Sequence, residues 1–216
     1  MRTKLPRWAG WALLANLVLA LILVPFVLGE QVVLAWTEAW FARPGSHEVA
    51  FGVVALLLAA DLLLPIPSSL VSAGSVAVLG PVLGGAAVWL GMTVGAVLGH
   101  VVGRTGGTAV ALRFVGAAEL ERARRLQERF GAAMLIVCRG VPVLAEASTL
   151  LAGALHMPFW PFLLVTGAAN FGLSLAYALS SRLGSGVVAM LAPFALGILV
   201  PALAIGIARL SLARRE

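Results

Sequence analysis

Charge and cysteine are both scarce in this chain of 216 residues. Only 11% of the residues are charged and 61% are hydrophobic, which excludes an ordinary soluble domain because such a domain exposes a large polar shell. Cys138 is the single cysteine, so an intramolecular disulfide and a cysteine metal site are excluded. His100 and His156 have no partners at metal-ligand spacing. We therefore expect neither a metal nor a cofactor.

The chain contains several long apolar stretches with few charged residues. A helix of about 20 apolar residues is long enough to cross the hydrocarbon core of a bilayer. Several stretches reach that length, so the sequence predicts an all-α integral membrane protein. The predicted full spans are Trp8–Gly29, Val82–Gly103, Pro158–Ser181 and Val187–Ala208.

The basic residues gather at the ends of the predicted spans. They precede the first span, follow the second and follow the last, namely Arg2, Lys4 and Arg7, then Arg104, Arg113, Arg122, Arg124, Arg125 and Arg129, then Arg209, Arg214 and Arg215. By the positive-inside rule, this bias places the N-terminus in the cytoplasm and Glu30–Glu48 outside. The first apolar stretch is too long for a signal-peptide core and is predicted to be a retained anchor. The basic residues do not alternate with aromatic ones, so no nucleic-acid partner is expected.

One apolar stretch, Val49–Gly80, contains two prolines. The interruption reads Leu64-Pro65-Ile66-Pro67-Ser68-Ser69. Proline removes a backbone donor and disfavours helical geometry in the residue before it. A broken helix at membrane depth is tolerated only inside protein or beside a wet cavity. We therefore predict a re-entrant helical hairpin that enters through Val49–Leu64 and leaves through Leu70–Leu79.

A second interrupted stretch is Ala132–Leu155, which carries Pro142 between Arg139 and Glu146. The segment Gly116–Gly131 before it is predicted to be a short cytoplasmic helix on the membrane surface. Its charges fall into i,i+4 pairs and its apolar residues share a side: Glu121–Arg125, Arg124–Glu128, and Leu120, Ala123, Leu126 and Phe130.

The two halves of the chain follow the same plan, an interrupted hairpin and then a full span. The first hairpin is expected to enter from outside and the second from the cytoplasm, which predicts two facing re-entrant hairpins in an inverted repeat. Such repeats point to a substrate site near the midplane of the membrane. The predicted regions are an N-terminal anchor and outer loop at 1–48, a core at 49–186, and a last transmembrane helix with a basic cytoplasmic tail at 187–216.

Three charged residues lie within the apolar stretches, namely Asp61, Arg139 and Glu146. Each costs ~2.5–3.5 kcal/mol at the bilayer centre, so each is expected to face a cavity or another of the three. Arg139 is the candidate for binding an anionic head group, because its planar guanidinium keeps its charge. Asp61 and Glu146 are candidates for carrying a coupling proton, because burial favours the protonated form of a carboxyl group. The alternative is a structural ion pair that joins the hairpins.

Small and polar residues near the breaks have more ordinary explanations. Ser68 and Ser69 are placed where they bind substrate or cap free backbone groups, and capping is the expected role of Ser148 and Thr149. The side chain of Asn170 is expected to form a structural hydrogen bond between helices. Glycines at every fourth position form a ridge that suits close helix packing and also permits a homodimer, namely Gly91, Gly95, Gly99 and Gly103.

The residues around both breaks follow a recognisable spacing. The first break has Asp61 and then Pro65-Ile66-Pro67-Ser68-Ser69 and Ala73-Gly74, and the next span ends in Gly103-Arg104-x-Gly106. The second has Arg139-x-x-Pro142, then Ala152-Gly153, Met157, Phe162 and Gly167. These motifs resemble those of the DedA/VTT-domain (SNARE-associated Golgi protein-like) family over roughly Val49–Arg182.

The resemblance implies a multi-pass protein of the bacterial inner membrane that moves lipids. Members of the family are linked to movement of polyprenyl-phosphate or phospholipid head groups, some of them with proton coupling, and eukaryotic relatives look like scramblases. Its partners would then be membrane lipids, with protons in coupled members. Many bacterial members have a second arginine six residues after the first, where this chain has Ala145. That difference weakens the case for polyprenyl-phosphate and favours a zwitterionic lipid or another anion.

Two other functions compete with lipid transport. A membrane polyprenyl-pyrophosphate phosphatase also places its site on re-entrant segments, but it needs a loop rich in serine and arginine, and Gly140–Glu146 has no serine. A non-transporting assembly protein has little use for buried charges beside broken helices. We therefore expect a transporter or scramblase rather than an enzyme, with no catalytic residues.

Overall fold

The computed structural model describes residues 10–20, 45–62, 64, 66, 68–139 and 142–183, with isolated positions at 24, 31, 35, 39 and 199. Within these residues the chain is helical and has no strand, which confirms the all-α prediction for them. Two helical stretches, Ser68–Val115 and Phe159–Leu179, are long and apolar enough to cross a membrane. Apart from Leu199, the predicted span Val187–Ala208 lies outside the described residues, as does most of the predicted outer loop.

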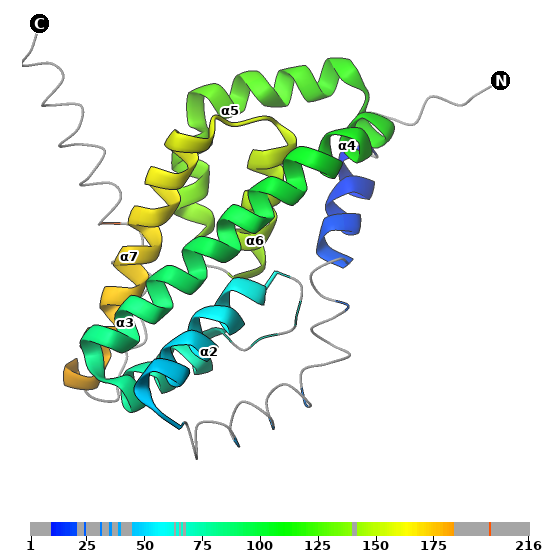
Figure 1. Ribbon diagram of the computed structural model, residues 1–216. Helices are drawn as coiled ribbons and strands as arrows, with labels where there is room; N and C mark the ends of the chain where they lie inside the picture. Colours follow the sequence, from blue (N-terminus) through cyan, green and yellow to red (C-terminus); the bar gives the residue numbers. More distant parts are fainter. Residues whose placement is uncertain are drawn as a thin grey trace, which may run out of the picture.

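The helices form an elongated bundle (Figure 1). In it α3 packs against α2, α6 and α7, and α5 crosses one end beside α4. The described elements are a helical segment at Gly10–Ala20, then α2 (His47–Ala60), α3 (Ser68–Val102), a π-helix η1 (Gly103–Gly107), α4 (Thr108–Val115), α5 (Ala117–Cys138), α6 (Pro142–Ala154) and α7 (Phe159–Leu183).

The first part of α3 turns back on itself at Gly80. Gly80 has a φ of 77° and a ψ of 171°, a conformation that glycine adopts readily, and Pro81 follows it inside the helix. The hydroxyl of Ser75 donates a hydrogen bond to the Gly84 carbonyl at 3.4 Å. In a straight helix, nine residues would separate these positions by about 13.5 Å. Residues 68–79 therefore form a separate helical arm.

This arm and α2 make a helical hairpin. Val54 and Leu58 of α2 pack in one cluster with Val71 of the arm and Val88 of the longer part of α3. The 14 residues of α2 span only about 21 Å, less than the ~30 Å hydrocarbon core. The hairpin has the predicted shape, and its entry into the membrane from one side stays a prediction.

The second hairpin differs from the predicted one in its first arm. We expected a separate surface helix at Gly116–Gly131, but α5 continues without a break from Ala117 to Cys138. A glycine inside a helix costs only about 1 kcal/mol relative to alanine. Gly131 therefore does not end the helix, since Leu135 and Ile136 beyond it pack in one cluster with Phe162 of α7.

The charged half of α5 forms one of its two predicted ion pairs. Arg125 contacts Glu121 at 3.2 Å as expected, but Arg124 also pairs with Glu121, at 3.9 Å, rather than with Glu128. The predicted apolar side is divided. Leu120 is buried against Ala111, whereas Leu126 and Phe130 are 56% and 51% exposed.

The glycine ridge of α3 serves packing within the chain. Gly91 and Gly95 approach the backbone of α2, and Gly103 approaches Leu150 of α6. We call Gly91, Gly95, Gly99 and Gly103 the glycine seam. Asn170 also packs as expected, because its amide donates to the Thr93 hydroxyl at 3.2 Å and joins α7 to α3. A homodimer stays a prediction.

Candidate functional site

The two hairpins meet at the middle of the glycine seam. A methyl group added at Gly99 would contact the Thr149 hydroxyl and would lie 3.2 Å from its Cβ and 3.5 Å from Cδ2 of Leu62. Leu62 belongs to the turn after α2, whereas Thr149 belongs to α6. The turn of the first hairpin therefore lies beside the second hairpin, on one face of α3.

Asp61 lies at this junction, directly after the last residue of α2. Its carboxylate accepts a hydrogen bond from the Ser68 hydroxyl, which opens α3, so one side chain from each arm closes the turn. Asp61 and Ser68 are half-buried, and Ser69 is exposed. Pro65 and Pro67 lie outside the described residues.

Arg139 directly follows α5, at the turn of the second hairpin. Its Nε and Nη2 atoms are buried and have no hydrogen-bond partner among the described residues. Leaving such donors unpaired costs about 1–3 kcal/mol each, and more for charged groups. The site therefore has hydrogen-bond donors that the described part of the chain leaves unused.

Glu146 lies near the start of α6, seven residues after Arg139, and its Oε2 atom is also buried, with no hydrogen-bond partner in the described part of the chain. The charge of Glu146 interacts with those of Asp61 and Arg139. Among the described residues, however, no ion pair joins Arg139 to either carboxylate. The predicted charges thus come together from both hairpins without neutralising one another by direct contact.

Ser148 and Thr149 are occupied by their own helix. Their hydroxyls donate to the backbone carbonyls of Ala145 and Glu146 at 2.7 and 2.8 Å, inside α6 rather than at backbone groups freed by the break. Ala145 itself is buried. Position 145 therefore faces protein.

Two further polar residues border the site. His100 is 1% exposed, stacks on Phe162 with ring centroids 4.3 Å apart, and has no hydrogen-bond partner for either ring nitrogen. Arg104 is exposed and donates to the Met157 carbonyl at 3.5 Å. This contact joins the end of the second span to the loop after α6, so it positions the hairpin.

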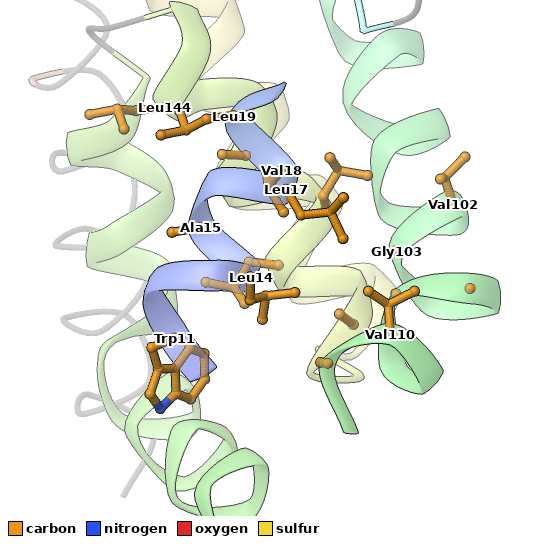
Figure 2. A pocket seen from close by; sticks show the side chains of 17 residues that line it. Trp11, Leu14, Ala15, Leu17, Val18, Leu19, Val102, Gly103, Val110 and Leu144 are labelled. Atoms are coloured by element: carbon orange, nitrogen blue, oxygen red, sulfur yellow. The ribbon is translucent and has the colours of Figure 1, made fainter. Parts of the chain in front are cut away.

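The sequence did not reveal an apolar groove beside the second hairpin. It has a volume of about 450 Å³ and lies between the helical segment Gly10–Ala20, η1 with the start of α4, and α6 (Figure 2). The one sequence feature that could have indicated the groove is a group of glycines at the end of the second predicted span. These glycines, Gly103, Gly106 and Gly107, all line the groove.

Comparisons with known proteins agree with the motif resemblance. The family profile described as the VTT domain matches residues 66–183, which include Ser68, Arg139 and Glu146 but not Asp61. The chain is 23% identical over 152 residues to undecaprenyl phosphate transporter A of Bacillus subtilis (strain 168), a match that covers 68% of this chain and 75% of that protein. No solved structure matches the chain.

Proposed function

This chain belongs to the VTT-domain (DedA) family of membrane proteins, and we propose that it moves a lipid with a phosphate-bearing head group across the bilayer. The observation that carries the proposal is the pair of buried, unpartnered nitrogens on Arg139. Arginine donors bind phosphate oxygens in pairs through charge-assisted hydrogen bonds. A phosphate at this position would supply the missing acceptors.

The roles of the other residues follow from their placement. Glu146 and Asp61 are the proposed proton carriers, because each is a carboxyl group within electrostatic reach of the other and Glu146 is also within reach of Arg139. Ser68 holds Asp61 in place through its hydrogen bond. Ser69, exposed at the same turn, is proposed to contact the head group.

The proposed transport path uses the two hairpins as re-entrant elements that enter from opposite sides of the membrane. The helices α2 and α6 are too short to span the hydrocarbon core, and the turn of the first hairpin meets α6 at Gly99. Broken helices that meet near the midplane form the substrate sites of many transporters with inverted repeats. We place the protein in the bacterial inner membrane with its N-terminus in the cytoplasm, because the basic residues then face the cytoplasm.

The lipid is proposed to be polyprenyl phosphate or a phospholipid. The name of the B. subtilis relative supports the former. Alanine at position 145 supports a head group of lower net charge, because one positive side chain fewer is available. Both lipids present the phosphate oxygens that Arg139 would bind.

The test is reconstitution of the pure protein in liposomes with labelled phospholipid or polyprenyl phosphate, with and without a pH gradient. We expect transbilayer movement by the wild type and its loss in Arg139→Ala and in Glu146→Gln, while both variants stay folded. Dependence on the gradient would identify proton-coupled transport, and movement without it would identify a scramblase.

Other outcomes point to other functions. If the folded wild type moves no lipid, the proposal is wrong, and phosphate release from polyprenyl pyrophosphate then tests the phosphatase alternative. If both variants lose activity only in proportion to their folded amount, the charges are structural. A chain that neither moves lipid nor releases phosphate would be an assembly protein.

A further inference from the structure

The groove beside α6 is open because of glycine. A methyl group added at Gly106 would find no atom within 4 Å, whereas one added at Gly103 would contact Leu150. Both glycines belong to η1, the π-helical turn that continues α3. Single π-turns are rare and often occur at functional sites. The lining is apolar: Trp11, Leu14, Leu17, Val18, Val110 and Leu151 are among its residues (Figure 2).

The groove adjoins the proposed head-group site through a single helix. Leu144 and Ala147 of α6 line the groove, and Glu146 lies between them in the sequence. Residues three apart lie on the same side of a helix, so Leu144 and Ala147 place one side of α6 toward the groove, and Glu146 belongs to another side of the same helix. Gly103 also lines the groove, and a methyl group added at Gly99, about one helical turn earlier in α3, would contact Leu62 and Thr149, so the groove lies about one turn from the junction of the hairpins.

Resting on the proposed function, we propose that the groove binds the hydrocarbon chain of the transported lipid while its phosphate lies at Arg139. The volume falls within the range of about 300–1,000 Å³ that is usual for ligand sites. The apolar lining suits a hydrocarbon chain and offers nothing to a polar ligand.

The groove would select its ligand by shape. A lipid chain is already in an apolar solvent, so its transfer into the groove gains little from the hydrophobic effect, and close packing decides affinity instead. Filling the groove with protein atoms would therefore exclude the chain and leave the head-group site intact.

The experiment uses phosphatidic acid with a diazirine at the end of one acyl chain. The full chain is placed in nanodiscs, illuminated and digested, and the labelled peptides are mapped. Transport of the same lipid is measured in liposomes. Gly106→Leu fills the groove, and Gly52→Leu is the matched control because Gly52 also has no atom within 4 Å of an added methyl group but lies on α2, away from the groove.

In the wild type we expect labelling concentrated on residues 10–20 and 142–154 and reduced by excess unlabelled phosphatidic acid. Gly106→Leu should lower that labelling and the transport rate at least fivefold, and Gly52→Leu should change neither by more than twofold. Thermal unfolding of both variants checks that they fold.

Labelling spread over all lipid-facing helices in proportion to exposure, with no competition, would show ordinary bilayer lipid only and would overturn the groove proposal. This map comes from the wild type, so it decides the question even if Gly106→Leu does not fold. Transport without groove labelling refutes the groove alone. Absence of transport in the wild type refutes the proposed function and, with it, the statement that the bound lipid is the transported one.

Discussion

Replacement of Arg139 by lysine separates its geometry from its charge. Lysine keeps one positive charge but lacks the planar set of donors. The Nε and Nη2 atoms of Arg139 make no hydrogen bond to any residue that the structure describes, so the substitution removes no such bond of theirs. We therefore expect Arg139→Lys to retain the stability of the wild type and to lose affinity for the lipid.

The size of the loss follows from the two free donors. A hydrogen bond to a charged group contributes about 1.5–3 kcal/mol. If lysine keeps one of the two contacts with the phosphate, the binding free energy of the other is lost. Since about 1.4 kcal/mol is a factor of ten, this loss weakens the affinity roughly 10- to 100-fold.

The assay measures initial transport rates in liposomes as a function of the mole fraction of labelled phospholipid. Arg139→Lys should raise the half-saturating fraction, and Arg113→Lys is the control because Arg113 is exposed in the last turn of α4. Thermal unfolding of each variant is measured in parallel.

Two results would refute the reasoning. Equal half-saturation in Arg139→Lys and the wild type would show that Arg139 acts only as a point charge. A fall in the unfolding temperature that matches the loss of activity would show that its role is structural.

Two further changes test the junction between the hairpins. Asp61→Asn removes one of the proposed proton carriers and should reduce the dependence of transport on a pH gradient; an unchanged response to the gradient would argue against a role in coupling. Gly153→Ala should destabilise the protein by about 1–3 kcal/mol through overpacking, because the added methyl group would lie 2.8 Å from the Arg104 backbone nitrogen. Thermal unfolding measures this against Gly52→Ala, and equal midpoints would show that α6 moves aside at no cost.

The sequence predicts the helix breaks well because their causes are local. Gly80 and Pro81 disfavour a straight helix whatever surrounds them, and the expected arm Leu70–Leu79 ends where the chain reverses. The continuous α5 was not predictable in the same way. Its persistence through Gly131 goes with packing of Leu135 against Phe162, a residue that is distant in the sequence.

The candidate site is only partly predictable for the same reason. Asp61, Arg139 and Glu146 lie within apolar stretches, and the cost of burying a charge there indicates from the sequence alone that they belong to a functional or structural site. Whether they form ion pairs depends on side-chain placement, which the sequence does not specify. The groove is still less predictable, because it forms between Gly10–Ala20, η1 and α6, three segments that have no shared pattern.

The glycine seam limits how this protein can change during evolution. A methyl group added at Gly91 or Gly103 would meet backbone atoms, those of Ala55 in the first hairpin or of Leu150 in the second, so a smaller side chain in the partner helix cannot make room for it. Gly99 touches Leu62 and Thr149 together. The clash at Gly99 is with the Thr149 side chain alone, because Leu62 lies at an ordinary contact distance, so suppressor screens that start from Gly99→Ala should recover single changes at Thr149, whereas screens that start from Gly103→Ala should recover none at Leu150.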